Sequence, residues 1–324
     1  FRVASRMFPS SVIIKGIGTK TILPFYHMVS DTPPFHVNQL YKVLSVKAFE
    51  RDLDYFLNYF TPIGANDLIR LLNNEVALDK PSVFLSFDDG FREVKETIAP
   101  ILLRKGLPAA FFDNPVCVGN NDLMYRCKVS LIANRIEAVK SLKSTYADIA
   151  SLLNTPNDVS KIKKQLFLLK HSQGDVISKI AELIDVDFNE YLRKNQPYLT
   201  LDDLQSLSQL GFTIGGHGYN HPYFNEISFE EQVLEVKRCM QWVGFNFPNQ
   251  PKLFAFPFTD CGVSDDLLKR IVSEQDVLCD LSFGTSGIQP IRFHGNLQRI
   301  PMEVNSVSGK RLVNAEILYY LAKK

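Results

Sequence analysis

Short apolar runs of strand length alternate with segments of helical periodicity along most of this 324-residue chain. The run at residues 82–87 is followed by helical spacing over residues 92–105 and by a second apolar run at residues 109–112. Strands of the same kind are predicted at residues 212–214 and 253–256. This alternation is typical of a mainly parallel sheet whose connecting helices lie outside it. We therefore expect an α/β fold.

Polar residues that could take part in catalysis follow several of the predicted strands. Asp88 and Asp89 end one strand, and His217 follows another. Parallel barrels carry their active sites at this end of the strands, whereas a dinucleotide-binding doubly wound sheet needs a glycine fingerprint that this sequence does not contain. We therefore predict a distorted (β/α) barrel as a single domain over residues 1–324. A helical insertion is expected at residues 125–196, where lysine-rich helical spacing interrupts the alternation.

The remaining periodicity predicts the first strand, the outer helices and the last strands. Thr200 is a predicted N-cap, and Ser228 with Glu231 forms a predicted capping box, so a helix should begin after each. Other helices are expected at residues 49–60, 66–73 and 264–273 and from 312 onward, and further strands at residues 21–27, 277–281 and 297–300.

The charge balance gives no support to a nucleic-acid or membrane-surface partner. The chain has 36 Lys and Arg against 35 Asp and Glu, a formal charge of +1, so no overall field attracts polyanions. No apolar run reaches the roughly 20 residues that span a bilayer. Five scattered cysteines favour reduced thiols and a cytoplasmic over an exported location, while a signal or anchor upstream of Phe1 stays open. The sequence does not indicate an oligomeric state.

Two motifs carry the residue types of a metal site. Asp88 and Asp89 stand side by side before Gly90, and their mutual repulsion is costly unless a cation lies beside them. The alternative is an acidic turn in which Gly90 supplies a positive φ. His217 and His221 lie in a loop, and two imidazoles with one carboxylate leave a coordination position open for water. The alternative is a pair of surface histidines in a glycine-rich turn.

In combination, these motifs resemble those of the polysaccharide deacetylase family, the NodB homology domain of the carbohydrate esterase type. Residues 86–90 read Ser-Phe-Asp-Asp-Gly and residues 217–221 read His-Gly-Tyr-Asn-His, in the order found in that family. The segment ending at His27 is similar to its early Tyr-His motif, and residues 254–258 are similar to its proline-containing third motif. The resemblance covers residues 22–301 and implies the family's barrel.

The resemblance implies a divalent metal held by Asp89, His217 and His221. Zinc is the expected ion, with cobalt and nickel as alternatives. The resemblance also implies that Asp88 is the catalytic base, which accepts a proton from the attacking water. The backbone N–H of Phe258 would stabilise the oxyanion that forms.

The motifs identify the metal ligands and the base more clearly than the general acid and the sugar contacts. His294, shortly before the last predicted strand, is the first candidate for the acid, and His27 is the alternative. Either histidine could instead be structural. Tyr219 and Phe258 are expected to stack on a sugar ring, because aromatic faces pack well on apolar surfaces.

One departure from the family's pattern concerns the base. Many members place an arginine in the third motif to hold the catalytic aspartate, but this chain has Ala255 there, which leaves Arg92 and Arg299 as candidate replacements. The implied activity is removal of N-acetyl groups from an amino-sugar polysaccharide, oligosaccharide or glycolipid in a bacterial surface-glycan pathway, with that N-acetylated glycan as the partner. Two alternatives stay open: hydrolysis of another C–N amide bond, or an inactive carbohydrate-binding member.

Overall fold

A computed structural model describes residues 8–138, 145–272, 278–304 and 307–323. Its central feature is a set of eight parallel strands in the order β10-β9-β8-β7-β6-β5-β2-β11. In chain order the strands are β2 (Pro24–Tyr26), β5 (Leu85–Phe87), β6 (Ala109–Asp113), β7 (Thr213–Gly216), β8 (Leu253–Ala255), β9 (Leu281–Gly284), β10 (Asn296–Gln298) and β11 (Ile300–Pro301).

The two outermost strands, β10 and β11, are consecutive in the chain and separated only by Arg299. β10 pairs with β9, and β11 pairs with β2 at the opposite end of the strand order. The Arg299 N–H donates to the Gly284 carbonyl at 3.1 Å, and the Ile300 N–H donates to the Leu23 carbonyl at 2.8 Å. One short segment therefore closes the sheet into a barrel, and the predicted (β/α) barrel is confirmed.

A smaller parallel sheet extends the barrel at the start of its strands. It contains β1 (Thr21–Ile22), β4 (Ser82–Val83) and β3 (Thr61–Pro62), in the order β1-β4-β3. β1 leads directly into β2, and β4 leads into β5. These strands lie at the end of the barrel opposite to Asp88 and Asp89.

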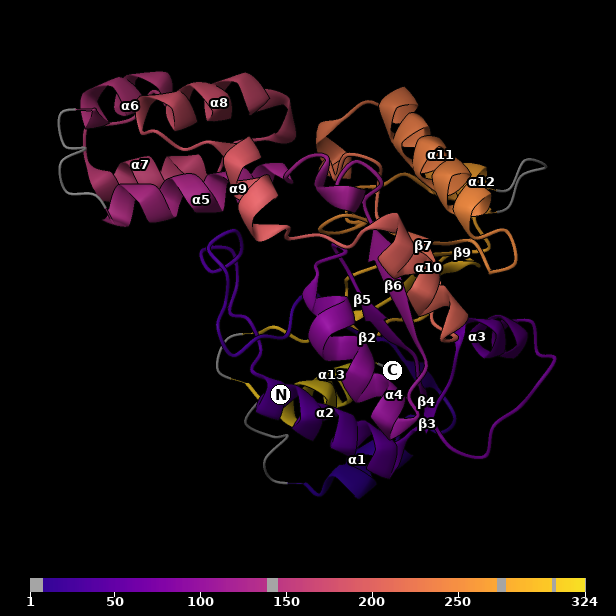
Figure 1. Ribbon diagram of the computed structural model, residues 1–324. Helices are drawn as coiled ribbons and strands as arrows, with labels where there is room; N and C mark the ends of the chain where they lie inside the picture. The colour runs from indigo at the N-terminus through magenta and orange to yellow at the C-terminus, as the bar shows by residue number, and fades with distance from the viewer. Residues whose placement is uncertain (1–7, 139–144, 273–277, 305–306, 324) are drawn as a thin grey trace.

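Helices surround the barrel, as the sequence predicted (Figure 1). Thr200 and Ser228 each form a capping box at a helix start, as expected. An N-terminal helix not foreseen from the sequence packs against the C-terminal one. The outer helices are α1 (Ser10–Lys15), α2 (Val46–Tyr59), α3 (Ala65–Leu72), α4 (Ala99–Lys105) after a π-helical turn (Val94–Ile98), α10 (Leu201–Gln209), α11 (Phe229–Asn246), α12 (Asp265–Val272) and α13 (Gly309–Ala322).

Between β6 and β7 the chain forms a group of helices that projects from the barrel, at the upper left of Figure 1. These helices bury an apolar cluster of their own, to which Ile132, Ile149, Ile162 and Ile180 belong. The five helices are α5 (Tyr125–Ala138), α6 (Tyr146–Leu152), α7 (Val159–Leu166), α8 (Gly174–Leu183) and α9 (Phe188–Asn195). We call α5–α9 the helical insertion.

Two strand predictions near the end of the chain need correction. The strand expected at residues 277–281 begins only at Leu281, because the N–H groups of Leu278 and Cys279 bond to the Ile271 carbonyl at the end of α12. Residue 277 lies outside the described residues. The single strand expected at residues 297–300 is two strands, since the chain changes partner at Arg299. Among the described residues no helix is long and apolar enough to span a membrane.

Candidate active site

The acidic pair lies in a tight turn at the end of β5. Asp89 and Gly90 both have positive φ angles, 76° and 63°. The Asp113 carboxyl, at the end of the neighbouring strand β6, occupies the space where a side chain on residue 90 would lie, 2.2 Å from an added Cβ. Any residue other than glycine would therefore displace this turn, so the backbone and its neighbour together orient the two aspartates.

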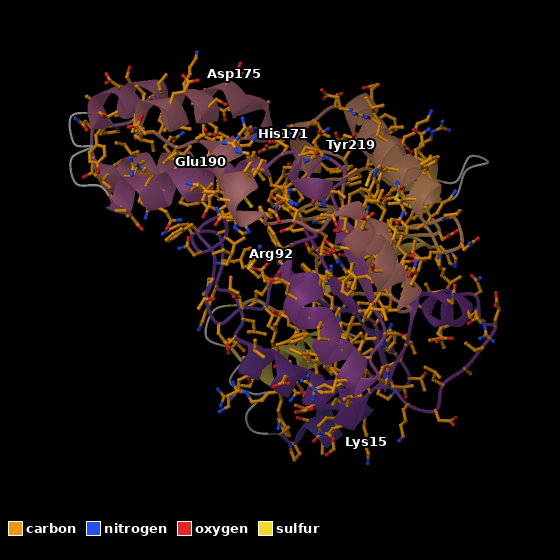
Figure 2. The ribbon with its side chains drawn as sticks, viewed as in Figure 1. Lys15, Arg92, His171, Asp175, Glu190 and Tyr219 are labelled. Carbon is orange, nitrogen blue, oxygen red and sulfur yellow. The ribbon has the colours of Figure 1, made fainter. Side chains whose placement is uncertain are left out.

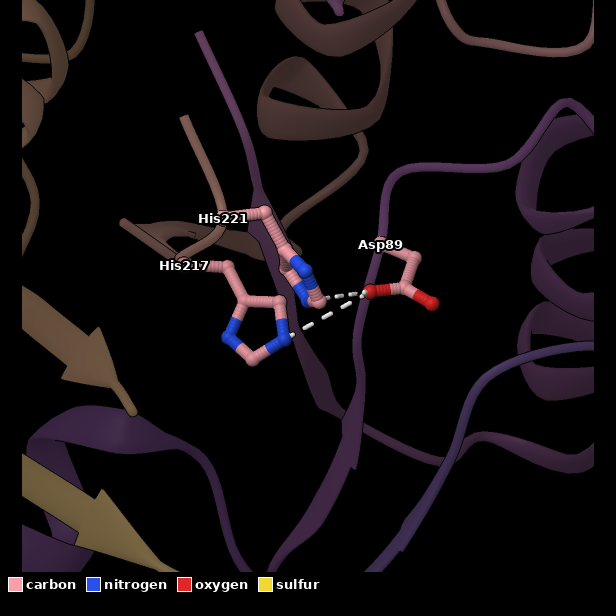
Figure 3. Close-up of side chains that lie close together, drawn as sticks. All are labelled: Asp89, His217 and His221. Carbon is pink, nitrogen blue, oxygen red and sulfur yellow. Dashed lines mark ion pairs between the residues drawn. The ribbon is translucent and has the colours of Figure 1, made fainter. Parts of the chain in front are cut away.

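Asp89, His217 and His221 converge in a buried cluster at the ends of β5 and β7 (Figure 3). Asp89 Oδ1 lies 3.5 Å from His217 Nε2 and 3.2 Å from His221 Nε2. Two ligands bound tetrahedrally to one zinc ion at about 2.0–2.1 Å are about 3.3 Å apart. The separations in this cluster therefore match those of ligands that share a single ion.

The protonation pattern of the cluster also fits a divalent ion. His217 Nδ1 donates to the Ala255 carbonyl at 2.9 Å, which directs the Nε2 lone pair toward Asp89. Burial lowers the pKa of His221 and keeps its imidazole neutral. Asp89 Oδ1 is buried and accepts no hydrogen bond among the described residues, so a cation bound there would satisfy it. One carboxylate and two imidazoles form a donor set for zinc.

Asp88 lies beside this cluster, with Oδ2 3.7 Å from His217 Nε2, and forms an ion pair with Arg299 inside the barrel. Arg299 Nη1 and Nη2 donate to Asp88 Oδ1 and Oδ2, each at 2.7 Å. Arg299 has no exposed surface, and its guanidinium lies 4.2 Å from the Phe25 ring centre. Burial would raise the pKa of Asp88, but the charge and hydrogen bonds of Arg299, together with the nearby His217 and His27, lower it overall. Arg299 thus supplies the cation that Ala255 cannot.

The other candidate partner of Asp88 lies at the surface. Arg92 forms an ion pair with Glu96 and donates to the Asn195 carbonyl at the end of α9, where Figure 2 labels it. It therefore joins the barrel to the helical insertion.

His27 follows β2, and Glu303 forms hydrogen bonds to its backbone and to its ring. Glu303 Oε1 accepts the backbone N–H groups of His27 and Met28 at 2.7 and 3.0 Å, and Oε2 bonds to His27 Nδ1. Burial would lower the pKa of His27, but the Glu303 carboxylate dominates and raises it to about 10. Because Nδ1 is engaged, Nε2 is the nitrogen available for proton transfer.

Asp88, Asp89, His27 and His221 share one cavity of about 510 Å³. Phe258 also lines it, with its ring centroid 4.7 Å from that of His221. The remaining lining residues come from the barrel, from the loop before α2 and from the helical insertion: Phe25, Leu40, Tyr41, Met124, Arg126, Phe167, Phe256, Thr285 and Pro301. The cavity therefore opens between the carboxyl ends of the strands and the insertion.

A family model described as polysaccharide deacetylase matches residues 75–275, more than half of the chain and both motifs of this site. The chain belongs to the polysaccharide deacetylase family. None of the curated proteins matches it significantly.

Several solved structures, among them two described as deacetylases, have the same fold. PplD, a Streptococcus pyogenes deacetylase in complex with acetate, is 16% identical with a TM-score of 0.57, over 91% of this chain and 97% of that one. IcaB from Ammonifex degensii is 14% identical with a TM-score of 0.57, over 93% and 97%. BC0361, a polysaccharide deacetylase from Bacillus cereus, is 11% identical with a TM-score of 0.55, over 93% and 69%. At these identities the likeness shows the fold alone.

Two site residues predicted from the sequence lie away from the cavity. Tyr219 turns toward α11, where its ring contacts the Arg238 guanidinium at 4.1 Å and its N–H donates to Glu235 (Figure 2). His294 is exposed and precedes β10, at the opposite end of the strands from Asp88. Of the two candidate acids, only His27 shares the cavity with the metal-ligand cluster.

Two residues of this site were not identified from the sequence. Asp113 ends β6 just as Asp88 follows β5, and Glu303 comes shortly after β11, so the strand-end rule could have found both. Burial and the charges of Asp88 and Asp89 raise the pKa of Asp113 to about 8. Asp113 is therefore a neutral acid at neutral pH, beside two ionised carboxylates.

Proposed function

We propose that this protein is a metal-dependent hydrolase that removes N-acetyl groups from an amino-sugar glycan. The observation that carries the proposal is the buried cluster of Asp89, His217 and His221 beside the Arg299-bound carboxylate of Asp88, with Asp88, Asp89 and His221 lining one cavity. Membership in the polysaccharide deacetylase family supports the same activity.

The three ligands would hold a divalent ion, with zinc as the proposed ion because the donor set is one carboxylate and two imidazoles. Such an ion acidifies bound water and polarises the acyl carbonyl. Asp88 accepts a proton from the attacking water, and Arg299 keeps it ionised and fixes the plane of its carboxylate.

Collapse of the tetrahedral adduct requires a proton on the leaving amine, and we assign its donation to His27 Nε2. Glu303 holds the opposite ring nitrogen and keeps the imidazole protonated at neutral pH. The oxyanion would be stabilised by the Phe258 N–H, which donates no hydrogen bond within the described part of the chain. His294, the first candidate acid from the sequence, has no part in this proposal.

The test separates metal binding from turnover. Asp89→Ala and His217→Ala should reduce the zinc content, measured by mass spectrometry, to near zero. Asp88→Asn should retain stoichiometric zinc and lose acetate release by about 10²–10⁴-fold, the range for removal of a general base. Arg92→Gln, outside the cavity, is the control and should behave like the wild type.

The substrates for this test are N-acetylglucosamine oligosaccharides and peptidoglycan fragments. Acetate release by zinc-loaded wild type that Asp88→Asn abolishes would support the proposal. Full activity of Asp88→Asn would contradict the assigned base. Release from none of the substrates despite bound zinc would favour hydrolysis of another amide or a binding role.

A further inference from the structure

One cation in the cavity wall has no assigned task. Arg126, on α5 of the helical insertion, lines the same cavity as Asp88, Asp89 and His221. Its guanidinium lies 5.0 Å from the centre of the Tyr125 ring and 5.7 Å from that of the Phe258 ring. These two rings hold the guanidinium in place at the cavity wall.

Most hydrogen-bonding capacity of Arg126 is unused. Nη1 donates to the Phe167 carbonyl at the end of α7, whereas a guanidinium offers five N–H donors. Among the described residues no carboxylate forms an ion pair with Arg126, and the nearby Glu226 pairs with Lys170 at 3.5 Å. A partly buried guanidinium whose one described hydrogen bond reaches a carbonyl leaves further N–H donors free for a ligand in the cavity.

The other charged groups of the cavity already have partners. Asp88 is paired with Arg299, and His27 is paired with Glu303. Asp89 belongs to the metal-ligand cluster. Arg126 is therefore the charge of the lining left without a counter-ion among the described residues.

Arg126 is placed to contact a substrate bound in the cavity. The Phe258 ring lies near both the His221 ring, with centroids 4.7 Å apart, and the guanidinium of Arg126, 5.7 Å from the ring centre. Arg126 and a proposed metal ligand therefore share one aromatic neighbour. A sugar whose acetamide reaches the ion would bring another substituent, or the next sugar of the chain, to Arg126.

We propose that Arg126 binds an oxyanion of the substrate, so that this deacetylase acts on acidic glycans in preference to neutral ones. The guanidinium fork matches a carboxylate or a phosphate through two parallel N–H···O hydrogen bonds. A uronic acid next to the N-acetylated sugar and a phosphate on that sugar offer the same chemistry. The inference rests on the proposed deacetylase function for its choice of substrate, but not for its binding test.

The kinetic test compares kcat/KM for matched substrates that differ in charge. The neutral member is chitotetraose and the carboxylate member is a hyaluronan tetrasaccharide. A second pair, N-acetylglucosamine and its 6-phosphate, tests phosphate. Wild type should prefer the acidic member of at least one pair by about tenfold or more, as expected for a hydrogen-bonded ion pair. Arg126→Gln should bring that ratio close to one, and Arg126→Lys should retain part of it.

Arg135 is the matched control for Arg126. It lies on the same helix and also donates to a backbone carbonyl of the insertion, that of Ile184 at 2.9 Å, but it does not line the cavity. Arg135→Gln should therefore keep the wild-type preference. A preference lost equally in both variants would mean that Arg126 acts only by holding the insertion together, and would overturn the inference.

The binding test separates this inference from the proposed function. Dissociation constants of the four compounds are measured by calorimetry on zinc-loaded Asp88→Asn, with and without Arg126→Gln. The inference is supported if an acidic compound binds more tightly than its neutral counterpart and the difference disappears in Arg126→Gln. This holds even if wild type releases no acetate, because the absence of acetate release would contradict only the proposed function. Equal binding of acidic and neutral compounds overturns the inference, whatever the turnover.

Discussion

At the scale of single residues, the site depends on two ion pairs that link distant parts of the chain. Asp88 and Arg299 are separated by 211 residues, and His27 and Glu303 by 276. In each pair the partner of the proposed catalytic residue comes from the segment that closes the barrel or from just after it. The electrostatics of the site therefore depend on barrel closure, and both pairs can be tested by pH–rate profiles.

Replacing Arg299 should impair the base without removing the metal ligands. In Arg299→Met, the buried Asp88 loses the charge that lowers its pKa, so burial raises that pKa. The base is active only when ionised, so the acidic limb of the kcat/KM profile should move to higher pH. Loss of one partner of a buried ion pair should also reduce the free energy of unfolding by about 3–5 kcal/mol.

The measurements for Arg299 are the pH–rate profile and urea unfolding, with Arg92→Met as the surface control. Arg299→Lys should recover only part of the activity, because an ammonium group cannot reproduce the two parallel hydrogen bonds to Asp88. An acidic limb at the same pH in Arg299→Met and wild type would refute the coupling.

Replacing Glu303 should impair the proposed acid in the opposite pH range. Glu303 raises the pKa of His27 to about 10 against the effect of burial, and an acid is active only while protonated. In Glu303→Gln the pKa of His27 should fall, so activity should be lost at lower pH than in wild type. The basic limb of the zinc-loaded enzyme's profile measures this shift, and an unmoved basic limb would exclude His27 as the acid.

At the scale of elements, a buried carboxylate joins two outer helices. Asp52 of α2 accepts the N–H of Gly309, the first residue of α13, at 3.1 Å, and the Tyr26 hydroxyl at 3.4 Å. The helices approach so closely that a Cβ on Gly309 would lie 2.4 Å from the Asp52 carboxyl carbon. Burial raises the pKa of Asp52 to about 6, above its ordinary value of 3.8.

Asp52 should therefore lower stability as the pH rises. Its folded-state pKa exceeds the unfolded one, so the penalty is absent below about pH 4, develops as the pH rises to about 6 and is complete above it. Asp52→Asn keeps an acceptor for Gly309 without the charge. Its free energy of unfolding should exceed that of wild type by about 1–3 kcal/mol at pH 8, at about 1.4 kcal/mol per pKa unit.

Urea unfolding at pH 8 and pH 4.5 measures this difference, which should shrink at the lower pH. Exposed Asp54, on the same helix, provides the control in Asp54→Asn. A difference between Asp52→Asn and wild type that does not change with pH would show that the pKa of Asp52 is the same in the folded and unfolded states.

The elements that the sequence predicted well have strong local signals. The capping residues Thr200 and Ser228 form hydrogen bonds to residues three positions later, so the local sequence is enough to predict where these helices begin. β10 and β11 were merged into one strand because a change of partner at Arg299 is a long-range event. α1 is short and is stabilised by packing on α13, which no local pattern reports.

At the scale of the whole molecule, alternation of strands and helices predicted the α/β class, and polar residues after several strands favoured the barrel. The motifs of Asp88, Asp89, His217 and His221, and the family they resemble, predicted these four as site residues. The partners of these residues were harder to predict. Arg299 was one of two open candidates, because its contact with Asp88 depends on barrel closure. Tyr219 was predicted to contact a sugar, but a side chain in a loop can turn to either side. Here it turns toward α11, where Arg238 contacts its ring and Glu235 accepts its N–H.

The segment that closes the barrel, residues 296–303, also affects the order in which the parts of the site are synthesised. Residues 296–303 carry Arg299 and Glu303, and a ribosome makes them only after every other barrel strand and both metal-ligand motifs. A nascent chain can thus present Asp89, His217 and His221 before the residues that tune Asp88 and His27 have been synthesised. Under the proposed mechanism, a chain that stalls late in translation would carry the proposed metal ligands but lack the partners of its proposed base and acid.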